Sequence, residues 1–139
     1  MLTISKTHSN AIAAHSVACF PDECCGALFG KIENTIKIVT ELKTITNHSD
    51  EDKRRRFKIS DDDYKQLEAY ATAHNVQLLG FYHSHPNHPA QPSETDLKYA
   101  WPFFSYLIQS VYDAVPKELN SFELNPDTMQ FSPEHIRVV

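Results

Sequence analysis

The sequence lacks two features that would direct the chain out of the cytoplasm. No segment approaches the roughly 20 apolar residues that a helix needs to cross a bilayer, and no signal-peptide pattern opens the chain. Its three cysteines, Cys19, Cys24 and Cys25, are an odd number with two adjacent, which fits reduced thiols better than a disulfide framework. We therefore expect a cytoplasmic protein with no membrane partner.

An excess of positive charge is also lacking. The net charge is -5 over 139 residues, whereas binding to a nucleic-acid backbone needs a concentrated basic face, so we expect no nucleic-acid partner. One basic run, at residues 53–56, is soon followed by three aspartates at 61–63. This run is either a solvated loop or a docking patch for an acidic protein partner.

The pattern of apolar residues predicts one domain, residues 1–139, of the α/β (α+β) class. Its sheet should be mixed but largely antiparallel, with about three helices around it. Helices are expected at residues 6–20, at 61–75 after the N-cap Ser60, and after Ser93. Strands are expected at residues 1–4, 23–30, 35–46, 57–59, 76–82, 103–111, 122–124, 129–131 and 136–139, with a loop at 47–56.

The segment His83-Ser84-His85-Pro86 follows the apolar strand at 76–82. Residues two apart on a strand point the same way, so both imidazoles can reach one point. Ser93 then resembles a helix N-cap, with Asp96 three positions later. Because positions i and i+3 share a helix face, Ser93 and Asp96 can both face the end of the strand.

Two imidazoles and one carboxylate are a ligand set of catalytic zinc, which keeps a fourth position for water. Each part is common by itself, because His-x-His pairs occur on ordinary strands and Ser-x-x-Asp caps ordinary helices. Their joint occurrence predicts a metal centre with His83, His85 and Asp96 as ligands of one Zn²⁺. A chain of this length can bury a core without a metal staple, so the zinc would be catalytic.

Such a centre needs a carboxylate that is not a ligand to take a proton from water. Glu23 is the best candidate, because it opens a strand that could lie beside the histidine strand. The alternative is that Glu23 is a surface acid in the turn after Asp22. A nucleophilic Cys24 or Cys25 is conceivable, although small buried thiols are the more ordinary interpretation.

These residues resemble the JAMM (MPN+) metallopeptidases, in particular their small single-domain prokaryotic members. The matching segments are Pro21-x-Glu23-x-Cys25-Gly26-x-Leu28-x-Gly30, Gly80-Phe81-Tyr82-His83-Ser84-His85-Pro86 and Pro92-Ser93-x-x-Asp96. The resemblance implies a curved mixed sheet similar to that of the cytidine deaminases. It also implies zinc ligands at His83, His85 and Asp96, a general acid/base at Glu23, and an oxyanion hydrogen bond from Ser93.

The resemblance implies a zinc metallopeptidase or isopeptidase, in which Glu23 assists the attack of zinc-bound water. The substrate would be the amide after the C-terminal Gly-Gly of a ubiquitin-like or sulfur-carrier protein. Two alternatives stay open. One is a metal hydrolase of the metallo-β-lactamase type, although Asn87 stands where its motif needs Asp. The other is a non-catalytic MPN binding module, which would not need Glu23. The carrier, the bond type and the oligomeric state are left open.

Overall fold

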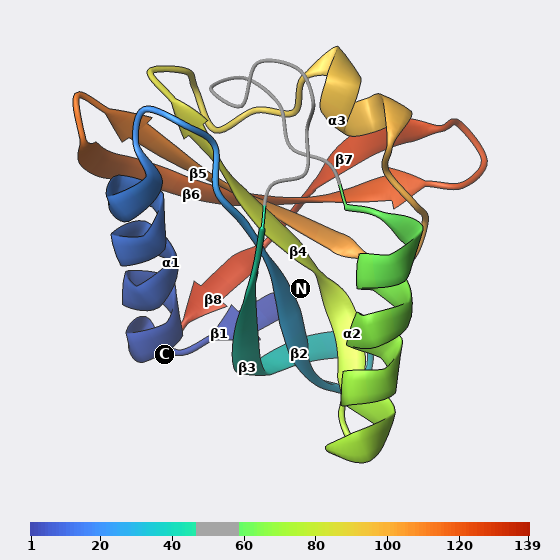
Figure 1. The fold of residues 1–139 in the computed structure, drawn as a ribbon. Coiled ribbons are helices and arrows are strands. Elements are labelled where there is room, and N and C mark those ends of the chain that lie inside the picture. Colours follow the sequence, from blue (N-terminus) through green and yellow to red (C-terminus); the bar gives the residue numbers. More distant parts are fainter. Residues whose placement is uncertain (47–58) are drawn as a thin grey trace.

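The computed structural model describes residues 1–46 and 59–139, which build an eight-stranded mixed sheet with three helices (Figure 1). The helices are α1 (Lys6–Cys19), α2 (Asp61–Ala73) and α3 (Glu94–Lys98). The strands are β1 (Leu2–Ile4), β2 (Cys25–Glu33), β3 (Ile36–Ile45), β4 (Gln77–Pro86), β5 (Ser105–Tyr112), β6 (Val115–Asn125), β7 (Gln130–Glu134) and β8 (Ile136–Val138). Within these residues no helix is long and apolar enough to cross a membrane.

The strand order is β7-β6-β5-β4-β2-β3-β1-β8. Neighbours are antiparallel at β2–β3, β2–β4, β5–β6 and β6–β7, and parallel at β4–β5, β1–β3 and β1–β8. The predicted mixed, largely antiparallel and curved sheet with three helices is therefore confirmed. The predicted hairpin of residues 23–30 and 35–46 and the edge strand near the end of the chain are also present.

One strand is longer than the sequence predicts. β6 begins at Val115, whereas the sequence predicts a strand only from residue 122. The turn before β6 places Asp113 and Ala114 at φ values of 49° and 64°, the left-handed pair of a type I′ hairpin. Alanine rarely adopts that conformation, so the sequence gives no turn signal there. The predicted loop at 47–56, with its basic run, and most of the predicted strand at 57–59 lie outside the described residues.

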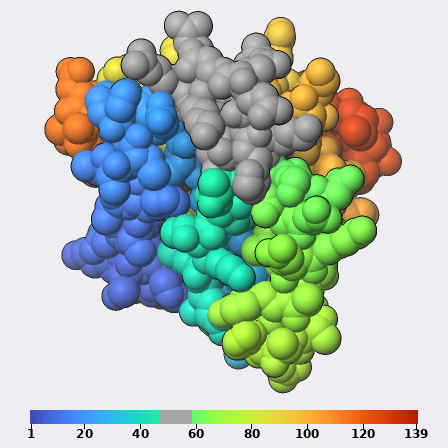
Figure 2. Space-filling model, in the orientation of Figure 1, coloured from blue at the N-terminus to red at the C-terminus, as the bar shows by residue number. Residues whose placement is uncertain are grey.

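α1 and α2 pack against different faces of the sheet. Ile12 of α1 lies in a core cluster with Leu79 and Tyr82, whereas Leu67 of α2 lies in a second cluster with Phe81. In the space-filling view the teal surface of β3 separates the blue surface of α1 from the green surface of α2 (Figure 2). The two helices thus divide the core into two halves, and each side chain of β4 must enter one half or the other.

Gly80 decides which half each β4 side chain enters. The pairing of β2 with β4 shifts register beside Gly80, so Leu79 and Tyr82 share the α1 face while Phe81 faces α2. A Cβ at Gly80 would lie 1.9 Å from the carbonyl oxygen of Ser105, so the close approach of β5 requires glycine there. Beyond this irregularity the alternation is regular, and His83 and His85 follow Phe81 onto the α2 face.

A buried polar network ties the curved sheet together across its interior. Lys37 of β3 is only 7% exposed and donates to the hydroxyl oxygen of Ser105 on β5 (2.7 Å) and to the Phe103 carbonyl (3.1 Å). Ser105 and Ser121 both donate to Glu134 Oε1, at 2.6 and 2.7 Å. β3 and β5 are not neighbours in the sheet, so these bonds stabilise its curvature.

We expect Lys37→Met to lower the free energy of unfolding by roughly 3 kcal/mol, because it leaves buried acceptors without their donor. Lys31→Met is the matched control. Lys31 pairs with Glu33 at 2.9 Å, but its side chain is 61% exposed, and the loss there should be below about 1 kcal/mol. Urea unfolding of both variants measures the difference, and equal losses would contradict a structural role for the network.

Candidate metal centre

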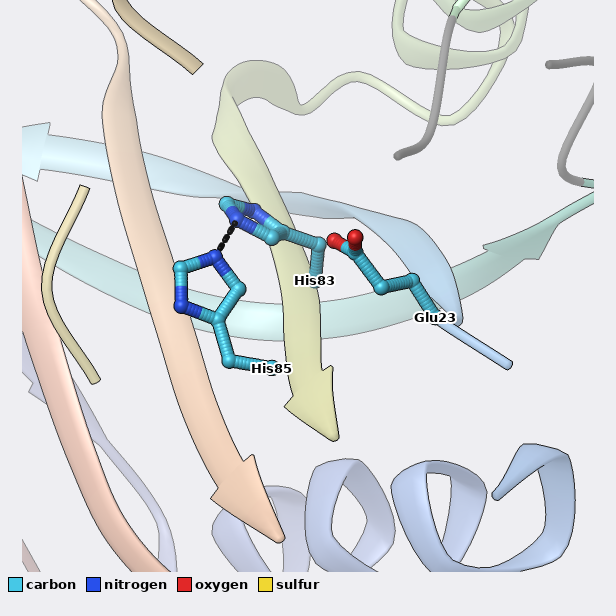
Figure 3. Close-up of side chains that lie close together, drawn as sticks. All are labelled: Glu23, His83 and His85. Atoms are coloured by element: carbon cyan, nitrogen blue, oxygen red, sulfur yellow. Dashed lines mark hydrogen bonds between the residues drawn. The ribbon is translucent and has the colours of Figure 1, made fainter. Parts of the chain in front are cut away.

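β4 presents two imidazoles to one point on the α2 face of the sheet. The Nε2 atoms of His83 and His85 lie 3.1 Å apart, and both residues are buried, at 1% and 8% exposure (Figure 3). The strand runs on to Pro86 and is paired with β5 from Gly80 to Pro86, so the histidines lie at its C-terminal end, as predicted, and within the sheet. A backbone that is hydrogen-bonded in this way holds both rings in place.

Asp96 comes to the same point from the first turn of α3. Its backbone N–H donates to Ser93 Oγ (3.1 Å), and its Oδ2 accepts from the Ser93 N–H (2.8 Å), which is a capping box. Asp96 Oδ1 lies 3.2 Å from His83 Nε2, and Oδ2 lies 3.2 Å from His85 Nε2. The bonds that begin the helix therefore also orient the carboxylate.

These distances fit a tetrahedral metal ion. Zinc binds imidazole nitrogen and carboxylate oxygen at about 2.0–2.2 Å, so donors at tetrahedral corners are about 3.3 Å apart. The two Nε2 atoms lie 3.1 Å apart, and each lies 3.2 Å from one oxygen of Asp96, which is Oδ1 for His83 and Oδ2 for His85. The three groups can hold one such ion and leave a fourth position for another ligand.

The surroundings orient the His85 ring and shift the pKa values of His83 and Asp96 in the directions that metal ligation needs. His85 Nδ1 lies 2.9 Å from the Pro89 carbonyl, and this contact orients the ring so that Nε2 points toward Asp96. Burial lowers the pKa of His83, which favours the neutral ring. Burial alone would raise the pKa of Asp96, but His83, His85 and the Ser93 N–H outweigh it and lower that pKa well below its usual range.

Glu23 lies beside the two histidines. β2 pairs with β4 so that Cys25 is opposite His83, and the pairing continues for one residue through Ser84 N–H to the Cys24 carbonyl (3.1 Å). Alternation then puts Glu23 on the same face as His83. The donor atoms of Glu23, His83 and His85 lie within 4.8 Å of one another, and Glu23 is 3% exposed (Figure 3). The alternative of a surface turn acid is therefore wrong.

Ser84, between the two histidines, makes contacts that the sequence did not predict. Its hydroxyl oxygen accepts from the Cys24 N–H at 2.9 Å, while its own N–H donates to the Cys24 carbonyl, and the side chain is fully buried. Two bonds thus fix the backbone immediately beside Glu23. The position of Ser84 between two histidines on a strand predicts that its side chain points to the opposite face of the sheet. Its partner on that face could not be predicted, because it depends on the pairing of β4 with β2.

The cysteines are poor nucleophiles in this setting. Cys24 points to the α1 side, 3.6 Å from Ser16 Oγ, and so faces away from the histidines. Burial raises the pKa of both the Cys24 and the Cys25 thiols, so both are protonated at neutral pH. The ordinary interpretation of these residues as small buried thiols agrees with this.

Ser93 precedes α3 and caps it. Ser93 is exposed, and its oxygen accepts the capping bond from Asp96, so its hydroxyl proton can still be donated to another group. An oxyanion role for Ser93 stays a prediction.

Asn87 and His88 give the metallo-β-lactamase alternative no support. Asn87 Oδ1 accepts from the Asp113 N–H (3.0 Å), and His88 is exposed.

Comparison with known proteins identifies relatives over most of the chain. A family model described as prokaryotic homologs of the JAB domain matches residues 5–125. A desampylase of Haloferax volcanii is 35% identical over 91 residues, which are 65% of this chain and 63% of that protein. A tail tip assembly protein K of Escherichia phage N15 is 34% identical over 89 residues, or 63% of this chain and 31% of that protein. The matches thus span less than two thirds of either curated relative.

Solved structures resemble the whole chain. A Desulfitobacterium hafniense protein has a TM-score of 0.83 at 30% identity, and a Salinibacter ruber protein has 0.76 at 36% identity. Each match covers 100% of this chain, and it covers 93% and 92% of those two proteins, respectively. A JAB1/MPN domain protein from Archaeoglobus fulgidus has a TM-score of 0.61 at 19% identity, with 100% and 97% of the two chains covered, and shares the fold.

We expect the purified protein to carry one zinc ion per chain and His85→Ala to lose it, because two remaining ligands hold zinc weakly. His88→Ala is the matched control, since His88 is exposed on the same segment. Elemental analysis of both variants after gel filtration gives the zinc-to-protein ratio. Full zinc content in His85→Ala would remove His85 from the ligand set.

Proposed function

The chain belongs to the prokaryotic homologs of the JAB domain, and on that premise we propose that it is a zinc-dependent metallopeptidase or isopeptidase. The observation that carries the proposal is the buried set of three donor groups, His83, His85 and Asp96, with a second carboxylate, that of Glu23, beside it. A non-catalytic binding module has no use for a buried second carboxylate at this point. Burial of a carboxylate is costly, so its presence favours a role in proton transfer.

In this proposal His83, His85 and Asp96 hold the zinc ion. Bound zinc would supply a Lewis acid that polarises the substrate carbonyl and lowers the pKa of a water molecule. Burial lowers the pKa of His83, and the two imidazoles with the Ser93 N–H lower that of Asp96, and each shift is in the direction that ligation needs. The Pro89 carbonyl and the Ser93 N–H restrain His85 and Asp96 from outside the ligand set.

Glu23 and Ser93 would handle the proton and the developing charge. The Glu23 carboxylate takes a proton from the attacking water and then gives it to the nitrogen of the leaving amine, so the carboxylate is regenerated. The Ser93 hydroxyl donates to the carbonyl oxygen as negative charge builds on it, while its own oxygen still accepts the capping bond. Ser84 would act as a positioning residue, since it fixes the backbone beside Glu23.

The proposed substrate is an amide after the C-terminal Gly-Gly of a ubiquitin-like or sulfur-carrier protein. The desampylase name of one curated relative supports removal of a ubiquitin-like adduct. The free thiols of Cys19, Cys24 and Cys25 are compatible with the reducing cytoplasm that we propose as its compartment.

Purified protein should release the attached group from fusions to candidate carriers that end in Gly-Gly, and a chelator should stop the release. Glu23→Gln keeps the shape and removes the proton acceptor, so the rate should fall at least ~100-fold with unchanged zinc content. Mass spectrometry of the products locates the cut, and elemental analysis gives the zinc. A variant that cleaves at close to the wild-type rate would end the assignment of Glu23.

Ser84→Ala should lower kcat by roughly 10- to 100-fold with little change in KM, because the backbone beside Glu23 loses one of the two bonds that fix it. Ser84→Thr keeps the hydroxyl and should restore most of the rate. Zinc content separates the two roles that Ser84 could have. If Ser84→Ala loses zinc together with activity, Ser84 supports the ligands on β4 and does not position Glu23.

A further inference from the structure

A cavity of about 300 Å³ opens directly beside the candidate metal centre. His83 and Asp96 form part of its wall, and the N-terminus of α2 contributes Ser60 and Asp61. Most of the rest is aromatic, with rings from Tyr64, Phe81, Tyr99, Trp101 and Tyr106. A group bound in this cavity would therefore contact apolar rings at one side and the metal ligands at the other.

The aromatic wall is built before any ligand arrives. The Trp101 N–H donates to the Tyr106 hydroxyl at 2.7 Å, and the Tyr64 and Trp101 rings meet edge to face with centroids 4.6 Å apart. Trp101 and Tyr99 nevertheless remain 43% and 49% exposed. Large rings that are fixed yet half open are suited to bury a further apolar side chain.

The position of Glu23 indicates which part of a substrate enters the cavity. Glu23 must reach the nitrogen of the leaving amine, but it does not line this cavity, whereas Asp96 and Thr95 at the start of α3 do. The leaving group therefore departs away from the cavity, and the acyl side of the substrate lies toward it. In the proposed substrate the acyl side is the carrier tail.

The reach of an extended tail fits this arrangement. Two glycines carry no side chain and would leave the cavity empty, while each extended residue advances the chain by about 3.3 Å. The residue just before Gly-Gly thus lies roughly 7 Å from the scissile carbonyl, which is about the width of a 300 Å³ space. Its side chain is the first that can meet the aromatic rings.

From this geometry we infer that the cavity binds one large apolar side chain, that of the residue immediately before the Gly-Gly of the carrier tail. The inference rests on the proposed function for the identity of the tail. It assigns the aromatic rings a role in substrate selection: tails with phenylalanine or leucine at that position are preferred over tails with glycine or glutamate, because only the former exchange water for ring contacts.

The single tryptophan of the chain makes the test direct, because Trp101 lies in the cavity wall and its emission reports on occupancy. The Glu23→Gln protein is titrated with the peptides acetyl-X-Gly-Gly, where X is Phe, Leu, Gly or Glu. The Phe and Leu peptides should bind at least ~10-fold more tightly than the Gly peptide. Phenylalanine amide, which mimics a leaving amine, should bind no more tightly than glycine amide.

Two tyrosine variants locate the effect. Tyr99→Ala removes a ring from the wall and should abolish the preference for Phe over Gly, and its half-exposed position limits the effect on folding. Tyr112→Ala makes the same change at a tyrosine that does not line the cavity and should keep the preference. Circular dichroism of both variants confirms that they fold.

Equal affinities for the Phe and Gly peptides, or a preference that survives in Tyr99→Ala, would overturn the inference, and so would a preference carried by the amine-side amides. Because binding is measured without turnover, the two proposals fail separately. A preference in the titration together with no cleavage of any carrier would sink the proposed function alone. Cleavage of carriers without a preference would sink the role of the cavity alone.

Discussion

The pairing of β2 with β4 is the constraint on which the rest of the site depends. With Cys25 opposite His83, a single register brings the acid before β2 level with the histidines and onto their face of the sheet. A slip of one residue would turn Glu23 to the α1 side and Cys24 to the α2 side. The buried bonds between Ser84 and Cys24, and the irregularity at Gly80, hold this register where it matters.

The centre is built from backbone geometry more than from long-range charge pairs. His83 is held by a strand that is paired there on both sides, His85 by the pairing of the same strand with β5, and Asp96 by the bonds that begin α3. The chain therefore meets most of the cost of ordering the donor atoms when it folds. A metal ion that binds afterwards loses little affinity to rearrangement.

Local patterns in the sequence were sufficient for most of the elements and for the residues that gather at the centre. The spacing of His83 and His85, the Ser93-x-x-Asp96 cap and the neighbourhood of Glu23 are short-range signals, and each corresponds to a local feature of the fold. What the sequence could not indicate depends on contacts between distant strands. The Lys37 network joins β3 to β5 across the interior, Ser84 finds its partner on β2, and the cavity needs rings from α2, β4, β5 and the segment after α3.

The length of β6 could not be predicted from the sequence for a different reason. Its turn uses Ala114 at a backbone conformation that alanine rarely adopts, so local propensity argued against the hairpin. Pairing with β5 over most of the length of both strands evidently offsets this cost. Tertiary contacts therefore determined an element that its own residues do not favour.

The capping box at α3 links binding of the ion to the stability of the helix. α3 has five residues, too few to be stable alone, and the Asp96 oxygen that begins it also faces the candidate metal position. An ion bound at that position would therefore stabilise this turn further, and Tyr99 and Trp101 follow the turn directly. A ligand that fills the aromatic cavity and stabilises that segment would raise the affinity for the ion. By thermodynamic reciprocity, the ion would raise the affinity for that ligand by the same factor. In a cell with little free zinc, such heterotropic coupling would let substrate itself favour the metal-loaded form.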